Sequence, residues 1–281
     1  MPQTKIKSYA KINLALNVIS KKLLLHKIET IVAFASLHDK IFIEKIKNKS
    51  HKIYFTGQFS KNISKKNTVS KLLKILDKKK LLQNQKYKIT IKKQIPNKAG
   101  LGGGSMNAAN ILKYFVKKRI IKIPKKEIIS ISKLIGSDVI LGLNSTYSVF
   151  NSRNEIKCFP NLKKLNILIA KPDFGCSTQE IYAKVRKFNK PEFNKPNKKM
   201  FDLKNLKKMQ NALENIVISK YSKLNKIKLF LENLSNQEFV RMTGSGSALV
   251  AYFKSKKKCD NAKKMFKRKY KNYWCISSKT I

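Results

Sequence analysis

Hydrophobic and polar positions alternate along the first part of the chain in the way that strands require. Between Lys5 and Ile19, apolar or small residues occupy every second position, which predicts a strand with one buried face. The same reading predicts further strands over Ile28–Phe34, Lys40–Ile46, His51–Thr56 and Tyr87–Lys93.

A helical spacing of apolar residues begins after these first strands. Apolar side chains recur three and four positions apart over Thr68–Lys80, and Asn67 directly before them is a typical N-cap. Further helices are predicted over Met106–Lys118, Lys126–Leu134, Thr178–Lys187, Leu203–Ser219, Lys223–Leu231 and Lys256–Lys269.

The second half of the chain mixes strands and helices without regular alternation. Tyr147–Phe150 and Ile156–Phe159 predict a hairpin, Leu165–Ala170 a buried strand, and two strands flank a turn at Thr243–Ser247. Phe188–Lys199 is expected to be a loop. The pattern predicts an α+β protein, and its length of 281 residues fits two domains, which we place at 1–155 and 156–281.

The net charge of +48 first suggests a nucleic-acid partner. However, 58 of the 63 basic residues are lysines, whereas phosphate and base recognition favours the arginine fork. The lysines are also spread along the whole chain. We therefore expect no specific nucleic-acid partner.

The cysteine and hydropathy patterns argue against a zinc protein, a membrane protein and a secreted protein. The four cysteines form no Cys-x-x-Cys pair and only three histidines are present, which argues against a zinc site. No apolar run is long enough for a membrane helix, and the basic N-terminus is not followed by the apolar block of a signal peptide. A cytoplasmic protein without a membrane partner is expected.

A glycine-rich loop is the strongest chemical signal. Four of the ten glycines lie within Gly100–Gly104, between a predicted strand and a predicted helix. Glycines allow an anion to approach backbone amides, and the start of a helix adds unpaired N–H groups, so the segment is a candidate phosphate-binding loop. It matches neither the P-loop nor the dinucleotide pattern, because no Gly-Lys-Ser/Thr follows and Ser105 stands where the last glycine would be.

Three motifs carry a resemblance to a known family. Pro96-x-x-x-Gly-Leu-Gly-Gly-Gly-Ser-x-Asn-Ala-Ala109, Ala10-Lys-Ile-Asn-Leu14 and Met242-Thr-Gly-Ser-Gly-Ser-Ala248 stand in the order found in GHMP kinases, which the chain resembles over nearly its whole length. The resemblance implies an S5-like N-terminal domain, a C-terminal α/β-sandwich domain, an active site in the cleft between them, and phosphoryl transfer from ATP with Mg²⁺.

Local strings are typical of the GHMP kinases that phosphorylate a diphosphocytidyl alcohol in isoprenoid biosynthesis. They are His26 with Thr30–Phe34, Gly136-Ser-Asp-Val139, Ser177-Thr178 and Asn211-Ala-Leu-Glu214. Leu25 departs from the pattern, because a tyrosine that stacks on cytosine usually precedes the histidine. Tyr9 also replaces a usual proline.

The resemblance implies a role for individual residues. Asp138 would be the general base and Lys11 the catalytic lysine beside it. Substrate contacts would come from Lys11, Asn13, His26, Asp138, Thr178 and Tyr182. ATP would be bound by Asn67, Pro96, Lys98, Ala99, Gly100, Leu101, Gly102, Gly103, Gly104, Ser105, Met106 and Asn107. Gly244, Ser245 and Gly246 would shape the neighbouring turn. Ser105 could touch Mg²⁺ or a β-phosphate, and no acidic metal cage is readable in the sequence.

Two alternatives remain open from the sequence. The chain could be another small-molecule GHMP kinase, acting on homoserine or a mevalonate-type substrate, which would leave the Ala-Lys-Ile-Asn-Leu start and His26 unexplained. It could also be a nucleic-acid-binding protein with an S5-like fold, which would leave the glycine loop and Asp138 without a role. A monomer or weak homodimer with small-molecule ligands is expected.

Overall fold

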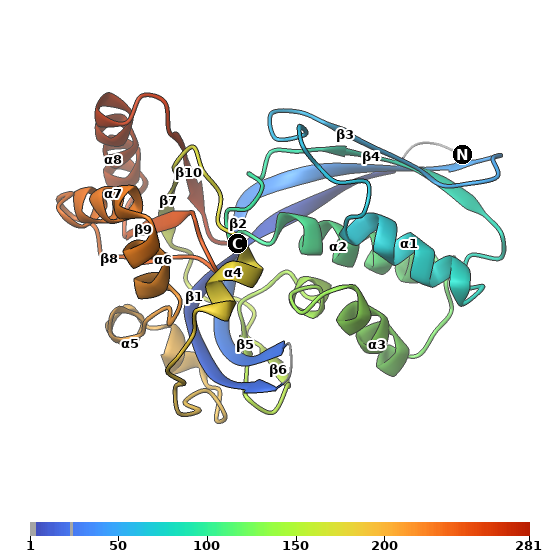
Figure 1. The fold of residues 1–281 in the computed structure, drawn as a ribbon, viewed down its shortest axis with the longest axis horizontal. Helices are drawn as coiled ribbons and strands as arrows, with labels where there is room; N and C mark the ends of the chain where they lie inside the picture. The colour runs from blue at the N-terminus through green and yellow to red at the C-terminus, as the bar shows by residue number, and fades with distance from the viewer. Residues whose placement is uncertain (1–3, 23–24) are drawn as a thin grey trace. The chain divides into compact units, whose positions relative to one another are not determined.

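The computed structural model describes residues 4–22 and 25–281, without the side chains of Lys22 and Leu25. The chain forms two compact units (Figure 1). Unit 1 contains the residues up to Ala10, Leu37–Asn97 and Gly102–Ser145, and unit 2 contains Lys11–Ser36, Lys98–Leu101 and Thr146–Ile281. Strands β1 (Thr4–Lys22) and β2 (Leu25–Ile46) belong partly to each unit. Each unit contains several separate segments of the chain, so the units cannot be divided at one position in the sequence. The domain boundary between residues 155 and 156 therefore stays a prediction.

Unit 1 is a sheet with helices packed on one face (Figure 1). Its strands are β3 (Lys52–Thr56), β4 (Lys86–Lys92) and the second part of β2, with β3 parallel and β2 antiparallel to β4. Its helices are α1 (Thr68–Lys78), α2 (Gly103–Lys117), α3 (Lys125–Ile135) and the short η1 (Ile140–Leu143). Alternating strand residues such as Ile89 and Ile91 meet the apolar stripes of these helices, which forms one continuous core.

Unit 2 is built on a four-stranded antiparallel sheet in the order β10-β7-β9-β8. These strands are β7 (Asn166–Lys171), β8 (Phe239–Met242), β9 (Leu249–Phe253) and β10 (Trp274–Lys279). The first part of β2 pairs with β5 (Ser148–Phe150), which pairs with β6 (Ile156–Cys158). Helical segments are α4 (Thr178–Ala183), η2 (Lys198–Phe201), α5 (Leu203–Lys208), α6 (Glu214–Lys220), α7 (Ser222–Glu232) and α8 (Lys256–Lys269). The predicted α+β class is confirmed.

The two strands predicted over Ile28–Phe34 and Lys40–Ile46 form one strand, β2. The residues between them do not turn, because Ala35 makes a bridge with Thr280 and Leu37 is buried. A local pattern cannot reveal a partner that lies so far away along the chain.

The prediction of one continuous helix over Leu203–Ser219 was wrong. The structure breaks it into α5 and α6, because the chain pairs with β1 at Asn211: Leu16 N donates to Gln210 O and Ala212 N donates to Leu16 O. The helix predicted to reach Lys187 also stops early, at Ala183.

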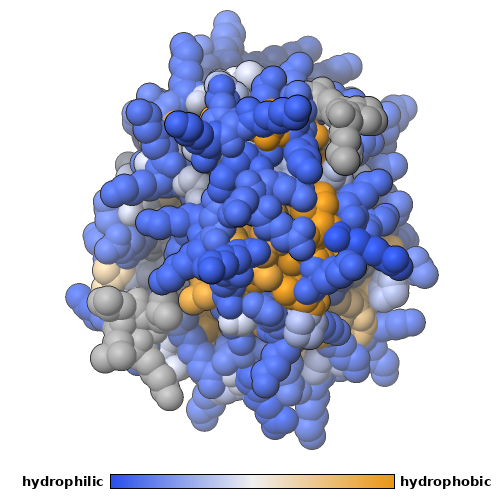
Figure 2. All heavy atoms as spheres, turned by 90° about the vertical axis from the view of Figure 1, so that its right-hand side faces the viewer, coloured by the Kyte–Doolittle hydropathy of each residue, from blue (hydrophilic) through white to orange (hydrophobic). Residues whose placement is uncertain are grey.

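The surface is consistent with the lysine-rich composition. Figure 2 shows one face on which hydrophilic residues predominate around a smaller hydrophobic area. Among the described residues, no helix combines the length and the apolar character that crossing a membrane requires.

Candidate active site

Lys11 and Asn13 lie on the same side of β1 in unit 2, since alternate strand residues share a face. Lys11 is 2% exposed, and its Nζ donates to Asn13 Oδ1 at 2.6 Å. The Asn13 amide in turn donates from Nδ2 to Thr30 Oγ1 on β2 at 2.8 Å. A buried ammonium is costly unless polar groups surround it, so this lysine differs in kind from the many solvated ones.

The third motif forms a turn locked to the first half of the glycine loop. Thr243 Oγ1 accepts a hydrogen bond from Asn13 N at 3.0 Å and lies 3.1 Å from Gly100 O. Ala248 N donates to Ala99 O at 3.2 Å. A Cβ placed on Gly100 would lie 1.9 Å from Thr243 O, and its φ is +72°, so only glycine fits there. The turn and residues 98–101 are therefore one rigid assembly.

Asn211 fixes the same turn from the other side. Its Nδ2 donates to Met242 O and to Gly244 O, both at 2.8 Å, while its Oδ1 accepts from Leu213 N. This asparagine belongs to the string Asn211-Ala-Leu-Glu214, and its sequence context alone predicts no role for it. The geometry makes it a residue that shapes the turn, together with Gly244 and Gly246, whose φ values are +54° and +80°.

Thr178 and Tyr182 stand on α4, which Ser177 caps by accepting from Glu180 N. Thr178 Oγ1 lies 2.8 Å from Ser245 Oγ. Cys176, the residue before this N-cap, donates from N to Lys98 O at 3.2 Å. The predicted substrate residue Thr178 is thus joined to the turn and the loop within unit 2.

His26 and Tyr182 form a ring pair in unit 2. Their ring centroids are 5.1 Å apart with an interplanar angle of 43°. His26 Nε2 is buried and has no hydrogen-bond partner among the described residues. Burial, and secondarily the charge of Lys21, hold the pKa of His26 below its ordinary value of 6.5. The imidazole is therefore neutral near pH 7, with a nitrogen that a ligand could engage.

The second half of the glycine loop begins α2 in unit 1. Gly102 is the N-cap with φ of +65° and contributes no side-chain hydrogen bond, so the first amides of α2 are not capped by that residue. Thr68 Oγ1 donates to Gly104 O at 2.7 Å, which ties the start of α1 to this turn. A helix start whose N-cap is a glycine leaves room for an anion at the first backbone amides and is chemically suited to phosphate.

Asn67 has a clear structural role. Its Oδ1 accepts from Val69 N and Ser70 N at 3.0 Å, while Ser70 Oγ accepts from Asn67 N at 2.9 Å, which completes a capping box. The predicted N-cap is confirmed, and a contact between Asn67 and ATP stays a prediction.

Asp138 lies between α3 and η1 in unit 1 and is half-buried. Its backbone carbonyl accepts from Leu141 N, which fixes the local turn. Lys11 belongs to unit 2, so the predicted pairing of these two side chains stays a prediction. Over residues 4–22 and 25–281, no group of three or more His, Cys, Asp or Glu side chains could hold a metal ion.

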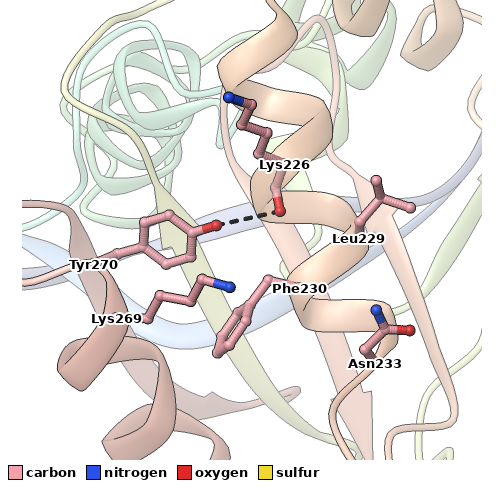
Figure 3. A pocket seen from close by; sticks show the side chains of 6 residues that line it. All are labelled: Lys226, Leu229, Phe230, Asn233, Lys269 and Tyr270. Carbon is pink, nitrogen blue, oxygen red and sulfur yellow. Dashed lines mark hydrogen bonds between the residues drawn. The ribbon is translucent and has the colours of Figure 1, made fainter.

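A separate surface pocket lies between α7 and α8 (Figure 3). Lys269 Nζ lies 4.9 Å from the Phe230 ring centroid, and Tyr270 Oη donates to Lys226 O at 3.2 Å. None of the predicted site residues lines this pocket, so we assign it no part in the candidate site.

Comparison with known proteins gives the family. The model of the GHMP kinase N-terminal domain matches residues 67–151, which include α1, the glycine loop and Asp138. Fold and matched domain together define a GHMP kinase, a small-molecule phosphotransferase with ATP as phosphate donor. A protein of Pelagibacter ubique (strain HTCC1062), 4-diphosphocytidyl-2-C-methyl-D-erythritol kinase, is 56% identical over 281 residues and all of both chains. The chain belongs to the family of 4-diphosphocytidyl-2-C-methyl-D-erythritol kinases.

More distant relatives and solved structures are consistent with this family assignment. The enzyme of the same name from Caldicellulosiruptor saccharolyticus is 34% identical over 260 residues, covering 89% of this chain and 88% of the relative. A crystal structure of 4-(cytidine 5'-diphospho)-2C-methyl-D-erythritol kinase has a TM-score of 0.78 at 21% identity, covering 99% of this chain and 100% of that one. A homoserine kinase from Cytophaga hutchinsonii has a TM-score of 0.71 at 14% identity, covering 100% of this chain and 95% of that one, and shows the shared fold alone.

Proposed function

We propose that this chain transfers the γ-phosphoryl group of ATP to the 2-hydroxyl of 4-diphosphocytidyl-2-C-methyl-D-erythritol, a step of non-mevalonate isoprenoid precursor biosynthesis in the cytoplasm. The observation that carries the proposal is the 56% identity over the whole chain to a kinase of that name. The alternative of a homoserine or mevalonate kinase is not favoured, because those enzymes share the fold at 13–15% identity only.

The glycine loop and the start of α2 would hold the ATP phosphates. The support is the glycine N-cap of α2, Gly102, and the rigid attachment of Gly100 to the Thr243 turn. Mg²⁺ bound with ATP would neutralise phosphate charge. Ser105, in the first turn of α2, would contact this ion or a β-phosphate. Among the described residues no group of three or more His, Cys, Asp or Glu side chains could hold the ion, so phosphate and water would be its main ligands.

Lys11 and Asp138 would perform the transfer. The substrate hydroxyl oxygen forms a bond to the γ-phosphorus while the bond from that phosphorus to the bridging oxygen of ADP breaks, and the hydroxyl proton passes to the Asp138 carboxylate. The Lys11 ammonium would offset the charge on the transferring group. Its hydrogen bond to Asn13 supports this, because it fixes the ammonium in place before the substrate arrives.

The cytidyl group would be held in unit 2 by His26 and Tyr182, with Thr178 and Asn13 contributing polar contacts. The buried, unsatisfied Nε2 of His26 among the described residues supports a hydrogen bond to the base. Tyr182 supplies an aromatic face next to it.

Release of ADP from ATP and Mg²⁺, measured separately with the diphosphocytidyl alcohol, homoserine and mevalonate, tests the proposal. We expect turnover with the diphosphocytidyl alcohol at least a hundredfold above that with the other two. A preference for homoserine or mevalonate would establish the other kinase class. ADP release with none of them, together with tight binding of RNA or DNA at physiological salt, would favour the nucleic-acid alternative.

A further inference from the structure

Asp39, on β2 in unit 1, is a fully buried carboxylate that lies outside the motifs and candidate site residues recognised in the sequence. Its Oδ1 accepts from Gln94 N at 2.8 Å and Ile95 N at 2.9 Å. Its Oδ2 accepts from Lys93 Nζ and, at 3.0 Å, from Asn107 Nδ2. One carboxylate therefore joins the chain that enters the glycine loop to the helix that leaves it.

The sheet register brings this pair together. In the antiparallel pairing of β2 and β4, Lys40 is opposite Lys92, so Asp39 and Lys93 are the next pair beyond the end of the ladder. The Lys93 side chain is 4% exposed, and a Cβ placed on Gly103 would lie 3.1 Å from its Nζ. The ammonium therefore supports the first residue of α2 from within the protein.

Asn107 depends on the same carboxylate. Its Oδ1 is buried and accepts no hydrogen bond from the described residues, so the contact of Nδ2 with Asp39 is the polar contact that orients this amide. Asn107 also stands one turn along α2 from Gly103, which places its anchor on the helix end that would face phosphate.

A buried ion pair is an expensive way to fill a core, since well-packed apolar side chains often stabilise a fold as much or more. Here every oxygen of the carboxylate is used, and each partner belongs to the segments on either side of the glycine loop. The arrangement therefore favours a role in fixing the conformation of the glycine loop over a role in stabilising the fold.

We propose that Asp39 and Lys93 are positioning residues for the ATP phosphates, which act by clamping the two ends of the glycine loop at the spacing that the nucleotide requires. The proposal rests on the nucleotide-binding part of the proposed function. Neither residue is part of the family motifs identified in the sequence.

Lys93→Met tests the clamp, because methionine keeps an unbranched side chain and removes the ammonium. We expect the Kd of a non-hydrolysable ATP analogue, measured by calorimetry, to rise at least tenfold, and KM for the alcohol to change less than twofold. Lys92→Met is the matched control. It removes the same charge from the neighbouring exposed lysine, and its Kd should stay within twofold of wild type.

The double variant Asp39→Asn/Lys93→Met separates positioning from stability. It removes both buried charges, so its melting temperature should recover relative to Lys93→Met alone, while its Kd for the ATP analogue should stay raised. A role in stability alone would make melting temperature and Kd recover together. That result overturns the proposal, as does a Lys93→Met Kd within twofold of wild type, or both variants failing to fold by circular dichroism.

The two proposals can fail independently. If the wild type binds the ATP analogue but phosphorylates none of the three alcohols, the proposed function fails and the clamp is still decided by the Kd values. If the wild type binds no ATP analogue, the clamp proposal fails together with the nucleotide-binding part of the proposed function.

Discussion

Gly100 and Thr243 are in such close backbone contact that a methyl group on the glycine would lie 1.9 Å from the threonine carbonyl oxygen. This contact joins the glycine loop to the third-motif turn within unit 2, and through Thr243 to Asn13 on β1. Three segments distant in the sequence thereby share one geometry, so a change at this contact should affect both stability and nucleotide binding.

Gly100→Ala should lower stability by more than about 2 kcal/mol, because the left-handed conformation and the clash act together. Thermal unfolding followed by circular dichroism measures it. Gly136→Ala is the matched control, since a Cβ there meets nothing closer than Val139 Cγ2 at 3.8 Å and its φ of 174° is open to any residue. Equal melting temperatures for the two variants would contradict the contact.

Asp138→Asn should reduce kcat by more than a thousandfold and leave the Kd of an ATP analogue within threefold, because the amide keeps the shape and cannot accept the proton. Steady-state rates and calorimetry measure both quantities. Asp260→Asn, on α8, makes the same chemical change outside the predicted site and should have wild-type rates. Retention of a tenth of the rate in Asp138→Asn, a loss of only about 1.4 kcal/mol of transition-state stabilisation, would mean that another group is the base.

Tyr182→Leu should raise KM for the diphosphocytidyl alcohol roughly tenfold, because base–aromatic stacking contributes about 1–3 kcal/mol. Tyr182→Phe should keep KM within threefold of wild type, since the aromatic face remains. Tyr270→Leu, in the pocket between α7 and α8, serves as a control with no expected effect on either KM. A KM unchanged in Tyr182→Leu would remove this ring from the base site.

Leu25→Tyr restores the residue usual in the family at a position whose side chain lies outside the described residues. We expect KM for the diphosphocytidyl alcohol to fall and both KM for ATP and kcat to stay unchanged, as for uniform binding. A raised KM would indicate that another ring, such as Tyr182 or Tyr9, already occupies the place. An unchanged KM would mean that position 25 does not face the base.

His26 should give substrate binding a pH dependence in the acid range. Burial lowers its pKa from 6.5, so the folded protein keeps the ring neutral at pH values where the unfolded chain is partly protonated. Its contribution to stability is therefore present above pH 6.5 and is lost as the pH falls through 6.5 toward the lowered value. KM for the diphosphocytidyl alcohol should stay constant at pH 6.5 and rise only as the pH falls to the lowered pKa of His26 in the folded protein. His26→Gln should lack that rise, and a rise that persists in the variant would assign it to another group.

Features that depend on local backbone chemistry could be predicted from the amino-acid sequence. The glycine loop, its place between a strand and a helix and the capping of α1 by Asn67 follow from residue types in a short window, because glycine conformations and caps are decided by near neighbours. The three motifs in order gave the family, and the structure agrees with it. At Gly103 a local pattern predicts only space for an anion. The structure shows that the absence of a side chain also makes room for Lys93 and Ile95.

Other residues of the candidate site could be recognised only from contacts between segments that are distant in the sequence. Lys93 is one of 58 lysines, and only the pairing of β2 with β4 places its ammonium beside Asp39, 54 positions away. Likewise, pairing with Leu16 of β1 interrupts the helical pattern at Asn211. The Asn211 side chain then bonds Met242 O and Gly244 O, about thirty positions further along the chain. At such positions burial and long-range hydrogen bonds override the local preference for a helix or a strand. The spacing of hydrophobic residues along the chain predicts neither of them.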